Sequence, residues 1–336
     1  MHPVDAACAW TRADFPERRE WARPLEQRHI TEIAAAVRAA RRAGLRAEEI
    51  GSDAFPLPTA ADLLRASRKD LETGPGFAVI EGFPLEDFST DECRVAFAGI
   101  CSHLGQVSVQ GHTGEKIIDV VDRDRPYDHT SRGYHSPHRL PFHTDGADCV
   151  GLLCLETAMQ GGTSLIASAS AVHNAILAER PDLWRVLNRG FRHHRRGEEP
   201  PGEEPISARV AVFGFHDNLF HCMYNRNPIE WAADARGGLE PAEREALDYL
   251  DGVIERPENQ LEMDLQRGDM QFLNNFVTLH SRTAYEDTPD RRRHMLRIWI
   301  AGTDRRRAGP TLLELYLPSA DGSAAGFRTT HARCRG

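Results

Sequence analysis

The sequence lacks the features that mark several common protein classes. No stretch approaches the roughly 18 apolar residues that a helix needs to cross a bilayer, and the chain does not start with a basic segment followed by an apolar one. The seven cysteines are scattered, odd in number and without a CxxC pair, which argues against a disulfide framework and a thiolate zinc site. We therefore expect reduced thiols, a cytoplasmic protein and no membrane partner.

Positive charge and common catalytic motifs are also missing. The formal net charge of −9 gives no general attraction to phosphate backbones, so we expect no nucleic-acid partner. The double glycine at 161–162 has no GxGxxG or GKT context and needs no explanation beyond a turn. No GxSxG motif supports serine hydrolase chemistry.

What is present is an ordinary globular composition, with 40% hydrophobic and 27% charged residues. Neither a linker nor an internal repeat divides the chain, so we expect a single domain over residues 1–336. Within it, residues 1–74 read as a helical N-terminal extension, 75–305 as the catalytic core and 306–336 as a C-terminal extension.

Short strands dominate the predicted secondary structure. Apolar periodicity predicts helices in ITEIAAAVRAARRAG and TAADLLRASRKDLETG and at 89–104, 170–179 and 241–254. Predicted strands are 76–83, 116–121, 150–156, 163–167, 208–215, 219–224, 261–265, 270–273, 277–280 and 294–301. This pattern predicts a mainly β fold with flanking helices, a double-stranded β-helix or jelly roll. Residues 122–140 and 192–206 look least ordered, and the first stretch reads as a substrate loop.

The segment LPFHTDGAD carries the first metal-binding pattern. His143 and Asp145 are two residues apart, which in an extended backbone places both side chains on one face. His280, in FLNNFVTLHSRTAYED, can supply a third ligand, and such a facial set leaves positions open for a cosubstrate and dioxygen on Fe(II). Asp148 is a rival carboxylate at the wrong offset. Asn275 could orient these ligands or satisfy turn backbone.

Six segments in order resemble the taurine dioxygenase and clavaminate synthase-like family of Fe(II)- and 2-oxoglutarate-dependent oxygenases. They are GFAVIEGFP, HLGQVSVQ, LPFHTDGADCVGLLCL, GGTSLIASASAVHNAI, RGDMQFLNNFVTLHSRTAYED and RRRHMLRIWIAG, and they span roughly residues 74–302. The resemblance implies a jelly roll that uses Fe(II), 2-oxoglutarate and dioxygen. It places the metal ligands at His143, Asp145 and His280.

The same resemblance implies how 2-oxoglutarate is held. The family binds its far carboxylate with an arginine just over ten residues beyond the distal histidine and with a hydroxyl after a Gly-Gly turn. These positions match Arg293 and Ser164. A planar guanidinium can grip a carboxylate bidentately, which agrees with the assignment. Arg291 and Arg292 are adjacent alternatives.

Period-two alternation along RRHMLRIWI selects among these arginines, because only one face of a strand can line the interior. The family pattern puts a second arginine, here Arg297, near the active site. Arg292 and His294 then fall on the opposite face, where solvent is expected. The inward set is Arg293, Met295, Arg297 and Trp299.

Four side chains are predicted to contact substrate. Tyr224 and Arg226, in HCMYNRNPIE, place an aromatic ring and a cation at a strand end. Core packing for the tyrosine and a surface ion pair for the arginine are the alternatives. His138 in the preceding loop and the inward Arg297 complete this set.

The resemblance implies oxidation of an unactivated C–H bond of a small polar molecule, carboxylate-bearing or amino-acid-like, with release of succinate and CO2. Hydroxylation is the default outcome, and desaturation or cyclisation stays open. Asp145 argues against halogenation, because related halogenases replace this carboxylate. Competing functions are a non-catalytic metal-binding jelly-roll sensor, which would want a fourth protein ligand, and a zinc-dependent hydrolase. We expect a small-molecule partner, and a homo-oligomer stays open.

Overall fold

Two sheets form the centre of the protein. The computed structural model describes residues 2–110, 114–124, 133–197, 199, 202–216, 218–302, 315–318 and 324–327. The larger sheet runs in the order β1 (Ala22–Pro24), β2 (Phe77–Glu81), β12 (Met270–Asn274), β6 (Cys149–Glu156), β15 (His294–Ala301) and β3 (Gln106–Ser108), with β4 (Ile117–Val120) also paired to β15. The smaller sheet runs β11 (Gln260–Met263), β8 (Ser164–Ser168), β13 (Thr278–Arg282) and β5 (Leu140–His143).

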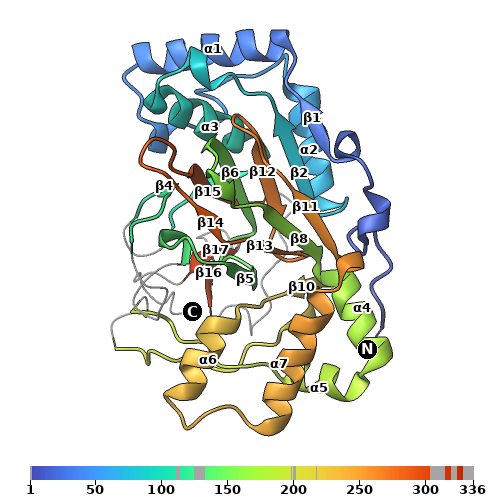
Figure 1. Cartoon of the computed structure of the whole chain (residues 1–336). Coiled ribbons are helices and arrows are strands. Elements are labelled where there is room, and N and C mark those ends of the chain that lie inside the picture. The colour runs from blue at the N-terminus through green and yellow to red at the C-terminus, as the bar shows by residue number, and fades with distance from the viewer. Residues whose placement is uncertain are drawn as a thin grey trace, which may run out of the picture.

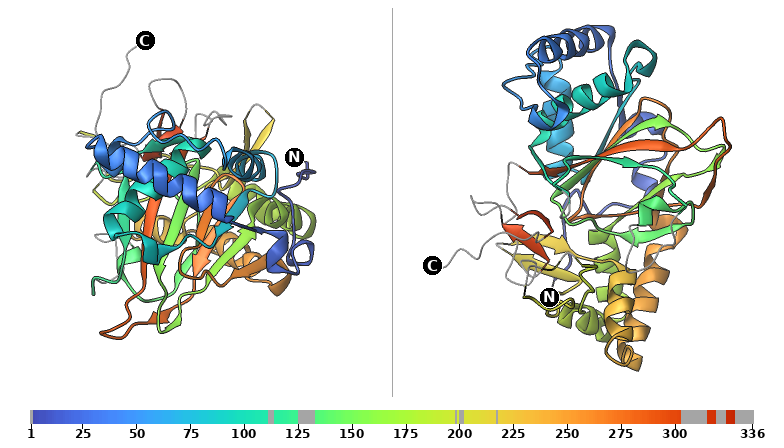
Figure 2. Two further views of the ribbon diagram at one scale, coloured as in Figure 1. Left: turned by 90° about the horizontal axis from the view of Figure 1, so that it is seen from above. Right: turned by 90° about the vertical axis from the view of Figure 1, so that its left-hand side faces the viewer.

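Helices cover the outer faces of both sheets (Figure 1). The larger sheet packs against α1 (Gln27–Arg42), α2 (Ala61–Glu72) and α3 (Thr90–Leu104). The smaller sheet packs against α4 (Ala169–Glu179), α5 (Pro181–Arg189) and α7 (Pro241–Ile254), with α6 (Arg226–Asp234) beside α7. Figure 2 shows the two helical groups at opposite ends of the molecule. The predicted jelly roll with flanking helices is confirmed.

Strand β2 shows how the sequence produces these layers. Phe77 and Val79 join the apolar cluster between the sheets, whereas Ala78 and Ile80 join the cluster under the helices. Because successive strand residues point to opposite faces, a strand covered on both sides must be apolar throughout. The run GFAVIEGF meets that requirement.

The structure differs from the sequence prediction in two helices, in part of one strand and in several short strands that were not predicted, among them β1, β3 and β5. Helices α5 and α6 were not expected, and the predicted strand at 208–215 begins only with β9 (Phe213–His216), which pairs with β10 (Leu219–Cys222). Both missed helices have proline in the first turn, Pro181 and Pro228, where its missing N–H costs nothing.

The remaining strands form short pairs, β7 (Gln160–Gly161) with β14 (Tyr285–Glu286) and β16 (Tyr316–Pro318) with β17 (Ala324–Phe327). The predicted irregular stretches at 122–140 and 192–206 and the C-terminal extension lie partly outside the described residues. Within the described ranges, no helix is long and apolar enough to cross a membrane.

Candidate metal centre and its pocket

Neighbouring strands of the smaller sheet bring the two histidines together. His280 of β13 is the register partner of His143 of β5, and their ring centroids are 4.2 Å apart. Asp145 follows β5 by two residues, and its Oδ1 lies 4.0 Å from His143 Nε2. One donor atom from each of the three residues lies within 4.8 Å of the others. The structure thus groups the three residues that the sequence singled out, and metal binding by them stays a prediction.

The protonation states fit a divalent cation. Burial lowers the pKa of His143. Burial, and to a smaller extent the charge of the neighbouring His143, lowers the pKa of His280 to about 3. Burial would raise the pKa of Asp145, but Arg297 and the two histidines together bring it below its ordinary value. Two neutral imidazoles and a carboxylate are the donors that non-haem Fe(II) takes. His280 Nδ1 is buried without a hydrogen-bond partner among the described residues, as suits a site completed by a bound group.

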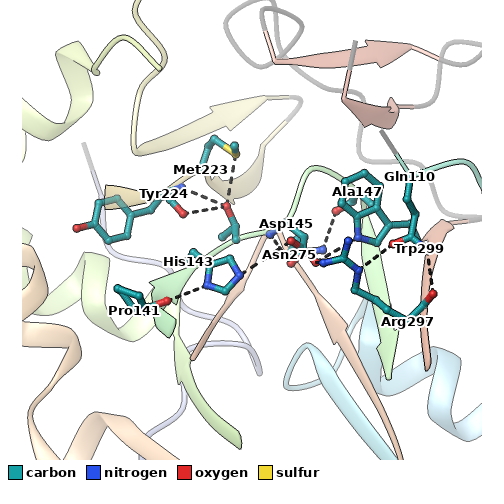
Figure 3. A network of polar contacts seen from close by, with 11 residues as sticks. Gln110, Pro141, His143, Asp145, Ala147, Met223, Tyr224, Asn275, Arg297 and Trp299 are labelled. Carbon is teal, nitrogen blue, oxygen red and sulfur yellow. Dashed lines mark hydrogen bonds and ion pairs between the residues drawn. The ribbon is translucent and has the colours of Figure 1, made fainter. Parts of the chain in front are cut away.

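His143 and Asp145 are each held by a hydrogen bond to the atom that does not face the cluster (Figure 3). His143 Nδ1 lies 2.8 Å from the Pro141 carbonyl oxygen, and the tautomer that donates there keeps the Nε2 lone pair toward Asp145. Trp299 Nε1 donates to Asp145 Oδ2 at 3.1 Å, and Arg297 Nη1 lies 3.7 Å from the same oxygen. Asp145 therefore turns Oδ1, and not both oxygens, toward the histidines.

Asn275 fixes the turn that carries Asp145. Its Oδ1 accepts the Asp145 N–H at 3.0 Å, and its Nδ2 donates to the Ala147 carbonyl at 2.9 Å. Of the two roles considered for Asn275, the structure supports both, since satisfying this turn also positions the carboxylate. The rival carboxylate Asp148 instead accepts the Gly302 N–H through Oδ2 at 2.9 Å, and it does not join the cluster.

The cluster opens into a pocket whose lining is strongly cationic. Its polar lining includes four arginines and, among the described residues, one carboxylate, that of Asp145. Apolar walls come from both sheets and the segments between them. The arginines are Arg196, Arg282, Arg293 and Arg297, and the apolar residues are Val120, Leu140, Val150, Leu152, Leu265 and Met295.

Strand β15, together with Arg292 and Arg293 just before it, alternates as the sequence predicted. Arg293 and Arg297 line the pocket. On the other face, Arg292 donates to the Asp122 carbonyl and His294 lies 2.7 Å from Asp119 Oδ1. The predicted inward and outward faces of this strand are those of the structure.

The end of the pocket away from the metal cluster contains the residues predicted to bind 2-oxoglutarate. Gln271 Nε2 lies 3.0 Å from Ser164 Oγ, and Arg293 is buried beside them. Burial lowers the pKa of Arg293. The double-glycine turn packs behind it: a Cβ on Gly162, where φ is +77°, would lie 3.1 Å from Arg293 Cδ and Nε. Only glycine suits both that backbone conformation and that close approach.

Three predicted substrate contacts lie elsewhere. The Tyr224 ring points away from Asp145 (Figure 3), and its hydroxyl donates to Asp251 Oδ1 at 2.5 Å. His138 meets the site through its backbone carbonyl, which accepts a hydrogen bond from Arg282. None of the three side chains lines the pocket. Arg226 pairs with Glu230, Asp248 and Asp251.

The position of Arg226 at the start of α6 explains why this side chain does not reach the pocket. Because the helix begins at Arg226, this side chain meets Glu230 one turn later. Helix α7 adds Asp248 and Asp251 to the same guanidinium. The alternatives weighed for these residues, a buried tyrosine and an ion-paired arginine, describe what the structure contains.

Sequence reasoning missed several pocket residues. Arg282 lies two positions after His280 on the same strand face, so the alternation applied to β15 would have found it. Gln110 accepts a hydrogen bond from Arg297 Nε at 2.8 Å, a contact from a distant loop that no local pattern signals. Gln271 and Arg196 were missed for the same reason.

Comparison with known proteins places the chain among oxygenases. The family model described as "Taurine catabolism dioxygenase TauD, TfdA family" matches residues 39–299. FR-33289 synthase of Streptomyces rubellomurinus is 34% identical over 337 residues, which cover 98% of each chain.

Solved structures share the fold. An asparagine oxygenase in complex with Fe(II), hydroxyasparagine and succinate superposes with a TM-score of 0.68 at 19% identity, covering 92% of this chain and 100% of that one. The non-haem iron oxygenase OrfP, in complex with Fe and alpha-ketoglutaric acid, gives a TM-score of 0.61 at 16% identity over 90% and 99% of the two chains.

Proposed function

The chain belongs to the taurine catabolism dioxygenase TauD, TfdA family, and on that premise we propose that it is an Fe(II)- and 2-oxoglutarate-dependent oxygenase. It hydroxylates an unactivated C–H bond of a small polar molecule and releases succinate and CO2. The observation that carries this proposal is the cluster of His143, Asp145 and His280 at one end of a pocket rich in arginine.

The proposed binding residues form two groups, one for the iron and one for 2-oxoglutarate. His143, Asp145 and His280 would hold the iron, while Arg293 and Ser164 would hold the far carboxylate of 2-oxoglutarate. With both bound, the site supplies this chemistry: dioxygen is consumed, the keto acid loses CO2 to become succinate, and a substrate hydrogen is replaced by hydroxyl. The protein's own contribution is to orient these groups and to exclude water.

Asp145 is arranged to bind through one oxygen. Its Oδ2 is engaged by Trp299, with Arg297 close by, which leaves Oδ1 for the metal. A single carboxylate oxygen and two imidazoles occupy three coordination positions and leave the others for ligands that react. A closed structural zinc site would need a fourth protein ligand, and the described residues contain none beside this cluster.

The lining of the pocket supports an anionic substrate. Two of the lining arginines, Arg282 and Arg293, form no direct ion pair with a described carboxylate, and the described carboxylate of the lining, that of Asp145, is assigned to the metal. 2-Oxoglutarate and the iron carry opposite charges of equal size, so the arginines still favour a further negative group. A carboxylate-bearing small molecule meets this requirement. Its ammonium group, if it were an amino acid, would find no second carboxylate among the described lining residues.

Consumption of 2-oxoglutarate tests the proposal. Protein reconstituted with Fe(II) under argon should form succinate only after dioxygen is admitted, and a substrate screen should raise that rate in step with product formation. A sensor would bind 2-oxoglutarate without succinate release, and a zinc hydrolase would turn over without dioxygen. Product mass separates hydroxylation, which adds one oxygen atom, from desaturation or cyclisation, which removes two hydrogens.

We also propose a cytoplasmic location. The six cysteines within the described residues are all buried and form no disulfide with one another, as is usual where the surroundings are reducing. A homo-oligomer stays a prediction, and light scattering on the purified protein would test it.

A further inference from the structure

Two buried arginines of the pocket lining pack on one tyrosine ring, and the carboxylates that act on them, Asp122 and Asp287, form no direct ion pair with either guanidinium. Arg282 and Arg293 are 6% and 8% exposed, and their guanidinium carbons lie 4.5 Å and 5.4 Å from the ring centroid of Tyr285. Neither forms an ion pair with a carboxylate of the described residues. Two buried like charges on one ring repel each other, and an anion between them would replace the repulsion with two attractions.

The strand register places Arg282 beside the hydroxyl assigned to 2-oxoglutarate. Arg282 of β13 is the direct partner of Ser164 of β8, and opposed residues of an antiparallel pair project from the same face of the sheet. Arg282, Arg293 and Ser164 all line the pocket. The far carboxylate of a cosubstrate seated on Arg293 and Ser164 therefore lies next to a second guanidinium.

The same guanidinium holds the wall of the pocket. Arg282 Nη2 donates to the Ser136 carbonyl at 3.0 Å and to the His138 carbonyl. Its Nε donates to the Thr283 carbonyl at 3.1 Å, so the hydrogen bonds to these three carbonyls use Nε and Nη2. Residues 136–140, here the wall segment, also receive hydrogen bonds at Pro137 and Leu140 from the Tyr285 N–H and the Ser281 hydroxyl.

The wall segment leads straight to the metal cluster. Its last residue, Leu140, begins β5, which ends at His143. Leu140 also lines the pocket. A residue that contacts both the cosubstrate carboxylate and this segment can stabilise them together.

We propose that Arg282 is a second anchor for the far carboxylate of 2-oxoglutarate and that it couples binding of this carboxylate to ordering of the wall segment. The inference rests on the proposed function. Its consequence is that bound 2-oxoglutarate stabilises the pocket wall beside it. Arg282 acts on the substrate side as a positioning residue.

The first test compares two keto acids. 2-Oxopentanoate matches 2-oxoglutarate in its chelating end and chain length but lacks the far carboxylate. Affinity for each is measured from the visible absorption change of the anaerobic Fe(II) protein, which needs no turnover. Arg282→Met should reduce the preference for 2-oxoglutarate by about thirty-fold or more, the usual loss when one partner of a buried charge pair is removed, and should leave 2-oxopentanoate binding nearly unchanged.

The matched control is Arg291→Met. Arg291 is exposed, contacts Thr157 and does not line the pocket, so this variant should keep the wild-type preference. If Arg282→Met also keeps that preference, or weakens both keto acids equally, Arg282 is no anchor. Arg282→Lys covers the case in which the methionine variant fails to fold: it retains the charge and should keep part of the preference.

Amide hydrogen exchange tests the coupling. In the wild type, 2-oxoglutarate should slow exchange in a peptide covering residues 136–140, and 2-oxopentanoate should not. In Arg282→Lys the slowing should disappear, because a single ammonium cannot serve two carbonyls and a carboxylate at once. Slowing by both keto acids alike would refute the coupling. Failure of the proposed function is distinct, since the wild type itself would then form no succinate from 2-oxoglutarate.

Discussion

The two ends of the pocket differ in how completely their charges are matched. At the metal end, Asp145 is surrounded by Trp299, Arg297 and the Asn275 amide, all within the protein. At the far end, Arg282 and Arg293 are buried and form no direct ion pair with a described carboxylate, and Asp122 and Asp287 act on them only from a longer distance. The metal end is therefore organised by direct contacts within the protein, whereas the far end has two cations left for an anion to contact directly. The following experiments test this difference.

Removing the carboxylate at the metal end should have the largest effect. Asp145→Ala deletes a predicted iron ligand. Loss of a residue that only hydrogen-bonds to a metal ligand usually costs up to about a hundred-fold in metal affinity, so here iron binding and succinate formation should fall by more than that. Iron content after gel filtration and succinate release measure the two effects. Asp148→Asn serves as control, since its carboxylate accepts the Gly302 N–H and does not join the cluster; equal loss of iron in both variants would contradict the assignment.

Removing a cation at the far end should weaken 2-oxoglutarate binding without changing iron binding. Arg293→Met should weaken 2-oxoglutarate binding by about thirty-fold and leave the iron content unchanged, because Arg293 does not contact the metal cluster. Binding curves at fixed Fe(II) provide the measurement. Arg292→Met, on the outward face of the same strand, should behave as wild type. A loss of iron in Arg293→Met would mean that the ends are not independent.

Removing the support of Asp145 should cost less than removing the ligand itself. Asn275→Ala leaves the Asp145 N–H and the Ala147 carbonyl without their partner, so iron affinity should fall by about ten-fold. Stability should fall by about 1–3 kcal/mol for the unsatisfied groups. Competition with a chelator and urea denaturation measure these changes. Wild-type iron affinity in a folded Asn275→Ala protein would show that the Asp145 turn is held by other contacts.

The smallest effect should come from anions alone. In metal-free protein, glutarate should raise Tm by about 1 °C, since roughly 0.8 kcal/mol of binding energy gives that shift in a chain of this size. Butyrate at equal ionic strength, with one carboxylate and no second charge, should give less. Equal Tm shifts with glutarate and butyrate would indicate that the far end has no preference for a dicarboxylate. Thermal denaturation followed by circular dichroism decides between these outcomes.

The sequence was most informative where local geometry determines the arrangement. The H-x-D spacing placed His143 and Asp145 on one face, and alternation along β15 separated Arg293 and Arg297 from Arg292. These inferences need only the period of a strand. The prediction that His280 joins His143 also required the order of the six resembling segments along the chain.

The errors arose where distant segments compete for a side chain. Arg226 had the chemistry of a substrate contact, but Asp248 and Asp251 on α7 take its guanidinium. Tyr224 is bound to Asp251 in the same way. No property of the segment HCMYNRNPIE reveals that a helix some twenty residues later will lie beside it. Long-range pairing of charges is therefore the part of the site that one sequence leaves undetermined.

The glycine turn behind Arg293 has a consequence for the proposed choice of keto acid. Gly162 has no side chain that could be lengthened or trimmed, and its backbone conformation excludes most replacements. The main chain therefore sets how close the turn lies to the guanidinium. On the proposed assignment, we expect that a shorter or longer dicarboxylic keto acid would be accommodated by rebuilding this turn rather than by replacing Gly162.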